Sequence, residues 1–453
     1  GKESSDMNII LLSGGSGKRL WPLSNDIRSK QFIKIFKNEE GVYESMLQRV
    51  YHQIKKAYPE ATVTIATSRA QVSAIHNQLG GSVGISVEPC RKDTFPAIAL
   101  ATAYLADIMH AGLDEPVVVC PVDPYVEDEY FKALKKLSVQ AGKSEANLVL
   151  MGIEPAYPSE KYGYIIPEDS SQTTRVSAFK EKPSAAMAEK YIKQGALWNG
   201  GVFAYKLRYV LDKAYDLTGY KSYQDLFERY GEFDKISFDY AVAEKEDKIQ
   251  VMRFHGKWKD LGTWNTLTEA MEEDIIGNGI LNDQCSGVHI INEMDVPVLA
   301  MGLHDIVISA SHEGILVSDK EQSSYIKPFV DSIEQQVMFA EKSWGNFRVL
   351  DVGNGAMIIK VSLKKGTSMN YHSHEHRDEV WIVTSGSGKA VIDGTRKDVH
   401  VGDVITMGAG CPHTIIAETE LTLVEVQIGK EISVQDKKKF KIDMAAIHLV
   451  DTI

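Results

Sequence analysis

The sequence predicts an α/β fold: a mostly parallel sheet in the N-terminal part, then a β-rich part that ends in a barrel. Strand and helix patterns alternate through the first 155 residues, which is typical of a parallel sheet with helices on both faces. From about residue 275, short strand patterns separated by turns replace the helices. After Trp344, glycines separate a further set of strands, as in a small antiparallel barrel or jelly roll.

Hydrophobic periodicity assigns the elements of the first part. NIILL (8–12) is a short apolar run before a glycine-rich loop, and PVVVCPV (116–122) is a continuous apolar run that suits a strand buried on both faces. Residues 95–111 place apolar side chains, the last of them Ile108, on one face of a helix. The other expected helices are 44–57, 71–79 and 129–143, and the other expected strands are 62–67, 85–89 and 147–153.

The later strands divide the chain further. The middle part contains the strand patterns GVHII, VPVLAMG, DIVISA and GILVSD, and the last part contains AMIIKVSL, EVWIVTSG, GKAVIDG, DVITM and LTLVEVQI. We therefore expect four parts: an α/β domain over 7–275, a small β-rich linker domain over 276–338, a barrel domain over 339–430 and a C-terminal tail over 431–453. Ligands of such α/β sheets sit at the carboxyl ends of the strands, so the first site to examine follows the first strand.

Charge and composition exclude several classes of partner. The 453 residues include 50 Lys and Arg against 62 Asp and Glu, so the net charge is −12, which argues against a nucleic acid or an anionic membrane as partner. No apolar run reaches the roughly 18 residues of a membrane span, and from the start GKESSDMN, which has no apolar core, we expect no secretion signal. The four cysteines are far apart without a CxxC spacing, so we expect a reduced, cytoplasmic location.

The glycine-rich loop is the densest chemical signal. After the first strand come Gly14, Gly15 and Gly17, and then the cations Lys18 and Arg19. Glycines allow backbone amides to close on phosphate oxygens, and adjacent cations offset the phosphate charge. The loop lacks the GK[ST] ending of a Walker A motif and the GxGxxG spacing of a dinucleotide fold. A glycine loop alone could be a tight turn, but the longer string GGSGKRLWPLS is far more specific.

This string resembles the signature of sugar-1-phosphate nucleotidyltransferases. RLWPLS with the following SKQF (29–32) resembles the mannose-1-phosphate guanylyltransferase branch. Other matching segments follow in family order, namely EPCRKDTFPAIALA, VCPVDPYV, YGYI, FKEKP, WNGGVF, FDYAVAEK and WKDLGTWN. The resemblance covers about residues 8–270 and implies a Rossmann-like nucleotidyltransferase domain, with GTP and mannose 1-phosphate as substrates.

The resemblance also implies roles for individual residues. The implied catalytic residues are Arg19, Lys30, Asp123 and Asp260, the two aspartates being the Mg²⁺ ligands. Those implied to bind the nucleotide are Gly14, Gly15, Gly17, Lys18, Arg19 and Asp93, and those implied to meet the sugar phosphate are Gly163, Glu181, Lys182 and Asn199. Two anions must meet in this reaction, so catalysis is mainly charge neutralisation and alignment.

Some positions depart from the family pattern. Ser29 replaces the usual proline and Gly200 the usual serine, while Asp93 and Phe95 replace the usual Asn and Ala near the nucleotide. The reaction class is therefore better defined than the base or the sugar, and another sugar 1-phosphate remains an alternative substrate.

A second chemical signal is a group of histidines in the last part. His372 and His374 are alternate residues, so on a strand they face the same side, and Glu379 and the distant His413 complete a set of four donors. Three imidazoles and a carboxylate suit a divalent transition metal, namely Zn, Fe, Mn or Co. A single buried histidine is usually structural, but this spacing on a strand-rich background is more often a metal site.

The histidine spacing resembles the cupin superfamily. The string HRDEVWIVTSG resembles the C-terminal half of type II phosphomannose isomerases, which fuse a guanylyltransferase and an isomerase in one chain. The stretch from MGLHDIVISA to YIKPFV resembles the linker of that family, a short left-handed β-helix. The isomerase pattern is incomplete, since His372 replaces Gln, Thr414 replaces an arginine and Ala417 replaces an asparagine. Without that arginine, the metal lacks an evident phosphate anchor.

The sequence thus favours a guanylyltransferase that makes a nucleotide sugar for polysaccharide synthesis, works as a homo-oligomer, most simply a dimer, and carries a metal-binding cupin of doubtful isomerase activity. Two alternatives for the cupin remain open. It could isomerise mannose 6-phosphate, or it could be a non-catalytic sugar-binding, regulatory or assembly module.

Overall fold

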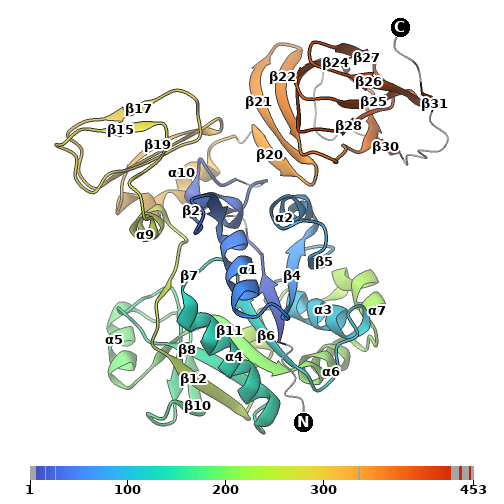
Figure 1. Cartoon of the computed structure of the whole chain (residues 1–453). Coiled ribbons are helices and arrows are strands. Elements are labelled where there is room, and N and C mark those ends of the chain that lie inside the picture. Colours follow the sequence, from blue (N-terminus) through green and yellow to red (C-terminus); the bar gives the residue numbers. More distant parts are fainter. Residues whose placement is uncertain are drawn as a thin grey trace.

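The structure is a computed structural model that describes residues 7–15, 17–25, 27–334, 337–429, 438–440 and 448–449. Figure 1 shows three parts: an α/β domain in blue to green, a group of yellow strands, and an orange-to-red barrel next to the blue segments. Within the described part of the chain, no helix combines the length and the apolar character needed to cross a membrane.

One large sheet organises the N-terminal domain. Its strands are β1 (Asn8–Leu12), β4 (Thr62–Ser68), β5 (Gly84–Glu88), β6 (Pro116–Pro121), β8 (Leu148–Ile153), β9 (Gly163–Pro167), β10 (Thr173–Lys180), β11 (Leu197–Lys206) and β12 (Ile249–Phe254). They lie in the order β5-β4-β1-β6-β11-β8-β12-β10-β9. The first four strands are parallel, as predicted, but β11 runs antiparallel to both β6 and β8.

Helices and short strand pairs surround this sheet. The helices are α1 (Met46–Ala57), α2 (Val72–Leu79), α3 (Thr94–Asp107), α4 (Asp128–Lys143), α5 (Ala185–Lys193), α6 (Leu207–Thr218), α7 (Tyr223–Glu228), α8 (Phe238–Ala241) and α9 (Trp264–Ala270). The 3₁₀ turns are η1 (Lys18–Leu20), η2 (Lys30–Phe32), η3 (Arg69–Gln71), η4 (Tyr230–Glu232) and η5 (Ala243–Lys245). Two short pairs lie beside the sheet, β2 (Lys34–Lys37) with β3 (Tyr43–Ser45), and β7 (Tyr125–Val126) with β13 (Trp258–Lys259).

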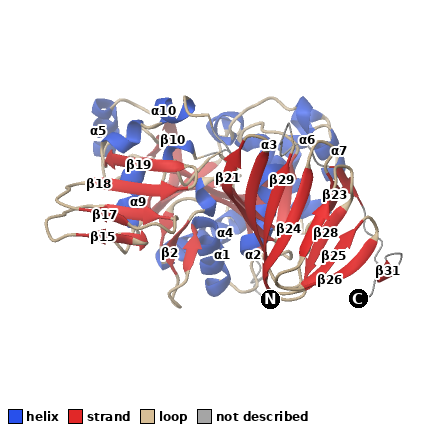
Figure 2. Ribbon diagram, turned by 90° about the horizontal axis from the view of Figure 1, so that it is seen from above, coloured by secondary structure: helices blue, strands red, loops and turns tan. Residues whose placement is uncertain are grey.

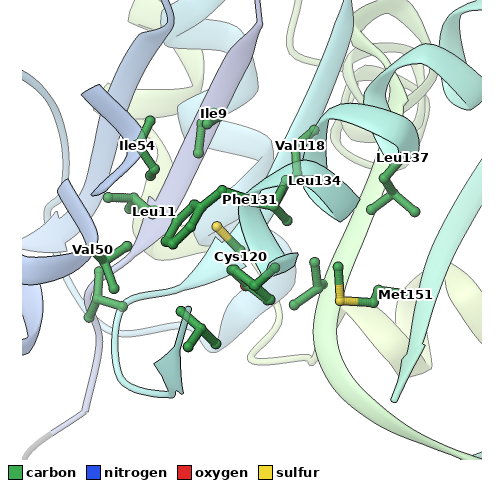
Figure 3. Packing of buried hydrophobic residues seen from close by; sticks show 14 of the residues in the cluster. Ile9, Leu11, Val50, Ile54, Val118, Cys120, Phe131, Leu134, Leu137 and Met151 are labelled. Carbon is green, nitrogen blue, oxygen red and sulfur yellow. The ribbon is translucent and has the colours of Figure 1, made fainter. Parts of the chain in front are cut away.

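The sheet has a hydrophobic core on each face. On one face, Val118 and Cys120 of β6 pack with residues of α1 and α4 such as Ile54 and Phe131 (Figure 3). On the other face, Val117 and its neighbours pack with α3 and α6. This arrangement confirms the prediction that the apolar run of β6 is buried on both sides. The predicted helix over 95–111 was wrong at its C-terminal end. Helix α3 stops at Asp107, and Ile108, expected on the apolar face, is 49% exposed.

The middle part has the coiled arrangement of a β-helix. Its strands are β14 (Ile275–Gly277), β15 (Gly279–Leu281), β16 (His289–Asn292), β17 (Val298–Ala300), β18 (Ile306–Ser311) and β19 (Gly314–Asp319), followed by η6 (Gln322–Tyr325) and α10 (Lys327–Asp331). β14, β16 and β18 form one parallel ladder, and β15 and β17 form another. From β14 to β18, successive strands therefore alternate between two small sheets, as in the coils predicted for this part, and β19 then pairs antiparallel with β18. The apolar core is shared with the N-terminal domain, since Ile291 and Val307 pack with Leu20, Leu23 and Trp264.

The last part is a barrel of two six-stranded sheets that face each other (Figure 2). One sheet contains β20 (Phe339–Lys342), β21 (Gly345–Gly353), β22 (Ala356–Leu363), β29 (Leu421–Ile428), β24 (Asp378–Ser385) and β27 (Val404–Met407). The other contains β30 (Lys438–Phe440), β23 (Tyr371–Ser373), β28 (His413–Ala417), β25 (Gly388–Ile392), β26 (Thr395–Val399) and β31 (His448–Leu449). Two short strands of the expected tail thus join the barrel, and the rest of that tail lies outside the described residues.

The barrel is docked on helix α2 of the N-terminal domain. The side-chain amide of Asn77 donates to the carbonyls of Lys342 and Gly345, at 2.8 Å and 2.7 Å. The backbone N–H of Ser343 donates to Ser73 Oγ at 2.8 Å. This contact joins β20 and the start of β21 to the surface of α2.

Candidate active site and metal centre

The glycine-rich loop carries the chain from the end of β1 to η1. Gly14 and Gly15 face open space, and Gly15 has a φ of 84°, a left-handed conformation that favours glycine. Gly17 is needed for a different reason, because a Cβ atom there would lie 2.8 Å from the Cβ of Lys30. The loop therefore leaves its backbone amides accessible to an anion and lets Lys30 approach closely.

The loop lines a cleft of about 1030 Å³. The predicted site residues that line this cleft are Gly14, Gly15, Gly17, Lys18, Arg19, Lys30, Asp123, Lys182 and Asp260. Asp93 lies instead in a neighbouring hollow of about 410 Å³, which shares Gly14, Gly15 and Asp123 with the cleft. The smaller hollow has the size to hold a nucleoside, and the larger, charged cleft has room for its phosphates. The glycine loop lies where the two join.

Strand pairing brings the two predicted carboxylates together. β7 and β13 pair with Tyr125 opposite Lys259, so Asp123, just before β7, and Asp260, just after β13, are neighbours. Lys30 Nζ lies 2.9 Å from Asp123 Oδ2. Burial alone would lower the pKa of Lys30, but the carboxylates of Asp123 and Asp260 outweigh it and raise this pKa above its ordinary value. Two carboxylates in a phosphate-sized cleft are the ligands that Mg²⁺ prefers.

The residues predicted for the sugar phosphate are spread more widely. Asn199 lies directly across the β9–β11 pair from Gly163, and its side chain donates to Asp239 Oδ1 at 3.1 Å. Glu181 belongs to an acidic group with Asp239 and Glu244. Burial and then a hydrogen bond to Glu181 raise the pKa of Glu244, and burial is also the main cause that raises the pKa of Asp239. Among the described residues, Gly163, Glu181 and Asn199 do not line the cleft that Lys182 lines.

A group of aromatic rings stands next to these residues. Tyr162 lines the cleft, and its ring centroid lies 4.9 Å from that of Trp198 and 5.4 Å from that of Trp258. Gly200 explains one departure from the family pattern, because a Cβ atom there would lie 2.5 Å from Ile153 Cδ1 and 3.3 Å from the Trp258 ring. The glycine therefore makes room for Trp258 against the sheet.

Among the lining residues that sequence reasoning missed, three charged ones bear on the chemistry of the two hollows. Glu88 lies in the smaller hollow and accepts a hydrogen bond from the Tyr230 hydroxyl at 2.7 Å. Burial is the main cause that raises the pKa of Glu88. Lys327 and Asp331, both on α10, line the larger cleft. The sequence carried a signal only for Glu88, which begins the EPC string, since α10 lies about 300 residues beyond the glycine loop.

The four donors predicted in the barrel come together as one buried cluster. The nearest ligand atoms of His372, His374, Glu379 and His413 all lie within 4.8 Å of one another. His372 on β23 is paired directly with His413 on β28, whereas Glu379 projects from β24 of the other sheet. His374 Nε2 lies 3.0 Å from Glu379 Oε1, and His413 Nε2 lies 3.1 Å from Glu379 Oε2.

The surroundings of this cluster orient the ligand atoms. The Nδ1 atoms of His372 and His413 bond to the backbone carbonyls of Asn370 and Cys411, which leaves each Nε2 for the centre of the cluster. Burial would raise the pKa of Glu379, but the close contacts of its carboxylate with the imidazoles of His374 and His413 hold this pKa well below its usual range. Glu379 Oε2 and His413 Nε2 are buried without a well-aligned hydrogen bond. Two such atoms 3.1 Å apart suit a shared cation, so the donor set fits a divalent metal ion.

Two further side chains contact Glu379. Arg377 Nε lies 3.0 Å from Glu379 Oε1, and Arg377 Nη2 lies 2.9 Å from His374 Nε2. Burial, and then the charge of Glu379, raise the pKa of the buried Glu425 to about 8. Trp381 Nε1 donates to Glu425 Oε1 at 2.8 Å. A cation and a buried acid thus flank the predicted metal ligands.

The position of Thr414 bears on the missing arginine. Its hydroxyl donates to the carbonyl of Met369 at 2.6 Å, and its neighbours His413 and Ile415 face the inside of the barrel. Because side chains alternate along a strand, Thr414 faces the other side of β28. The side chain of an arginine at position 414 would leave the strand on the face away from the histidine cluster. Arg377 is instead the cation that contacts the cluster.

Comparisons with known proteins find two family matches in the chain. The profile of the family described as "Nucleotidyl transferase" matches residues 8–275, and that of "Cupin domain" matches residues 359–427. A "Putative mannose-1-phosphate guanylyltransferase" of Vibrio cholerae serotype O1 is 30% identical over 472 residues, which span 95% of this chain and 99% of the relative. The alginate biosynthesis protein AlgA of Pseudomonas putida is 27% identical and is covered to 95% in both chains.

A solved structure shows the same fold for the larger part of the chain. It is titled as the crystal structure of a mannose-1-phosphate geranyltransferase from Thermus thermophilus, and it is 28% identical. The match has a TM-score of 0.61 and covers 72% of this chain and 98% of that chain.

Proposed function

The chain belongs to the nucleotidyl transferase family, and from this premise we propose that it transfers a nucleotidyl group from GTP to mannose 1-phosphate, forming GDP-mannose and pyrophosphate. Relatives that match nearly the whole chain are named as mannose-1-phosphate guanylyltransferases. The family and the two-part fold predicted from the sequence, a nucleotidyltransferase followed by a cupin, are both confirmed. Relatives named for alginate and xanthan biosynthesis support a role in supplying polysaccharide synthesis.

The observation that carries the proposal is the meeting of the glycine loop, Lys30 and the Asp123–Asp260 pair in one cleft. A phosphate oxygen of the sugar phosphate attacks the α-phosphorus of GTP, and the bond from that phosphorus to the β-phosphate oxygen breaks. Both reactants are anions, so neutralising their charge supplies most of the rate enhancement. The loop amides and Arg19 bind the triphosphate, and Lys30 meets the reacting phosphates.

Asp123 and Asp260 would hold Mg²⁺, which when bound neutralises the developing charge on the phosphates. Lys30 is held 2.9 Å from Asp123, so the chain places its own cation beside the metal-binding carboxylate. Lys182 enters the same cleft from the side of β10 and meets the sugar phosphate. The acidic group of Glu181, Asp239 and Glu244 accepts hydrogen bonds from sugar hydroxyls, with Asn199 positioned by Asp239 and by Gly163 across the strand pair.

The smaller hollow holds the nucleoside. Asp93 at its edge caps α3, its carboxylate accepting from the backbone N–H of Thr94 at 2.7 Å, and the glycine loop closes the side that leads to the phosphates. Glu88 offers a carboxylate fixed by Tyr230, and guanine is the base that presents an amino group and a ring N–H together on one edge. This pairing favours GTP among the nucleoside triphosphates.

We propose that the cupin binds a divalent transition metal through His372, His374, Glu379 and His413, with Zn, Fe, Mn and Co as candidates. Isomerisation of mannose 6-phosphate is the second candidate function, and the observation in its favour is Arg377, a cation next to two metal ligands. We also propose that the enzyme acts in the cytoplasm and that it forms a homodimer. Light scattering of the purified protein tests the dimer.

A substrate panel tests the main proposal. The full-length protein is assayed with Mg²⁺ and each pairing of GTP, ATP, UTP or CTP with mannose, glucose or galactose 1-phosphate, and pyrophosphate release is measured. We expect the highest kcat/KM for GTP with mannose 1-phosphate. A different best pairing would keep the reaction class and replace the substrate, whereas no pyrophosphate release with any pairing would overturn the proposal.

A further inference from the structure

Helix α10 of the linker domain lies against the proposed nucleotidyl-transfer site. We propose that Lys327 on this helix binds the β- and γ-phosphates of the triphosphate, which leave as pyrophosphate, and that Asp331 positions Lys18 beside them. The linker would then complete the catalytic site as well as connect two domains. This inference rests on the function proposed above and adds a phosphate-binding residue from a second domain.

The placement of α10 is fixed by packing. Val330 is 1% exposed and Ile326 is also buried, so one side of the helix is held in the apolar core. Lys327 and Asp331 are four residues apart, so they share one exposed side of the helix, next to the buried side, and both line the cleft. The burial of Ile326 and Val330 fixes how the helix is turned, and in this position the side with Lys327 and Asp331 borders the cleft.

The linker is also locked onto the segment that follows the glycine loop. The hydroxyl of Ser311 donates to the carbonyl of Pro22 at 3.0 Å. A Cβ atom at Gly314 would lie 2.4 Å from the Trp21 ring, so a glycine is needed where β19 begins. Within the α/β domain, Trp264 Nε1 donates to the Trp21 carbonyl at 3.0 Å and so fixes the position of Trp21. These contacts hold the linker and the loop in one arrangement, which a shared phosphate site requires.

The positive charges that line the larger cleft suit a leaving pyrophosphate. Lys18 Nζ lies 3.7 Å from Asp331 Oδ1, and Lys18, Arg19 and Lys327 all line the larger cleft and not the nucleoside hollow. Asp123, the proposed metal ligand, lies instead where the cleft meets the nucleoside hollow. A triphosphate that runs from the nucleoside hollow past the glycine loop would place its terminal phosphates in the larger cleft, which Lys18, Arg19 and Lys327 line.

A purely structural role accounts poorly for Lys327. Within the described parts of the chain, its side chain makes no ion pair or hydrogen bond, so no polar contact of Lys327 links the domains. Lys327 lines the same cleft as Lys18 and Arg19, so a polyphosphate bound there would be attracted by all three charges.

The test uses Lys327→Met, the conservative Lys327→Arg, and Lys320→Met as the matched control. Lys320 belongs to the same domain but faces Asp305 and Asp274 and does not line the cleft. KM values are measured for GTP and mannose 1-phosphate in the forward reaction, and for pyrophosphate in the reverse reaction with GDP-mannose. Binding of pyrophosphate with Mg²⁺ is measured separately by calorimetry.

We expect Lys327→Met to raise KM for GTP and for pyrophosphate about tenfold, while KM for mannose 1-phosphate changes less than about twofold. Lys327→Arg should retain most of the affinity, and Asp331→Asn should weaken pyrophosphate binding less than Lys327→Met does. Equal pyrophosphate affinity in wild type and Lys327→Met would overturn the inference, as would an equal loss in Lys320→Met. If the wild type released no pyrophosphate from GTP, the proposed function would fail, and the calorimetry would still decide whether Lys327 binds polyphosphate.

Discussion

Lys30 Nζ lies 2.9 Å from Oδ2 of Asp123, at the point where the nucleoside hollow meets the larger cleft. Gly17 makes this possible, because any larger residue there would collide with the Lys30 side chain. The pair therefore depends on a glycine, a 3₁₀ turn and the end of a buried strand, which are separated in sequence. It also links the proposed metal ligand to the proposed phosphate-binding cation, so the charge of each should affect the other.

Replacing either proposed Mg²⁺ ligand should abolish most turnover. We expect Asp123→Asn and Asp260→Asn each to lower kcat by roughly 10² or more, about 2.7 kcal/mol, because each removes a full negative charge from the metal site. The measurement is pyrophosphate release at saturating Mg²⁺ with a thermal melt to check folding. Asp114→Asn, at the opposite end of β6 and exposed, serves as control and should keep wild-type turnover. Normal kcat in both site variants would remove the two aspartates from the mechanism.

Arg19 should contribute to both binding and catalysis. We expect Arg19→Ala to raise KM for GTP and to lower kcat, since its charge meets phosphates in the ground state and the transition state. Arg19→Lys should restore only part of the loss, because an ammonium group cannot grip phosphate with two parallel hydrogen bonds. Arg208→Ala, which removes an exposed arginine paired with Asp114, is the control. Unchanged KM and kcat in Arg19→Ala would reduce the loop to a turn.

Glu88 should determine the preference for guanine. We expect Glu88→Gln to lower kcat/KM for GTP by about tenfold, the effect of one lost charged hydrogen-bonding pair in a binding site. The loss should be smaller for ITP, which lacks the 2-amino group of guanine. Tyr230→Phe removes the hydroxyl that donates to Glu88 at 2.7 Å and should give a weaker effect of the same kind. An equal loss for GTP and ITP would place the amino group outside the reach of Glu88.

The sequence predicts the sites best where function and strand pattern coincide. Asp123 follows a continuous apolar run, and the structure places it at the end of β6 in the cleft. His372 and His374 were expected to face one way from their spacing alone, and both lie in the buried cluster. In these cases local periodicity determines the direction of the side chain, so a single sequence is sufficient.

Other features depend on contacts between distant segments. The antiparallel insertion of β11 between β6 and β8 is a matter of strand order, which no local pattern encodes. Lys327 enters the cleft only because the linker packs against Trp21 and Pro22. The sequence pattern also drew attention to Thr414, whereas the structure brings Arg377 to the cluster, because alternation on β28 turns residue 414 away.

The two ends of the chain should be chemically independent. We expect His374→Ala to lose the bound cupin metal, because it deletes one of four clustered ligands, while nucleotidyl transfer falls less than about tenfold, or 1.4 kcal/mol. The cleft lining among the described residues includes no residue of the cupin, which supports this independence. Metal content is measured by elemental analysis after purification, and His400→Ala, an exposed histidine of the same domain, is the control. Parallel loss of both properties would show that the cupin supports the transferase.

The wild-type chain should isomerise mannose 6-phosphate weakly or not at all. Isomerisation needs a metal or acid to polarise the carbonyl and a free cation to hold the phosphate. Arg377 is 9% exposed and is engaged with Glu379 Oε1 and His374 Nε2, so the cation that the fold supplies is committed to the ligands. We therefore expect isomerase turnover at least about 10³-fold below nucleotidyl transfer, a barrier difference of about 4 kcal/mol.

A coupled assay for fructose 6-phosphate, run on metal-loaded protein whose metal content is known, measures this turnover. Arg377→Lys and Arg377→Ala are assayed beside the wild type. If the wild type turned over robustly and Arg377→Ala lost that activity while keeping its metal, Arg377 would be the phosphate anchor that the sequence lacks at position 414. The chain would then be bifunctional, and the ion pair with Glu379 would be a resting position that the guanidinium leaves when metal and substrate bind.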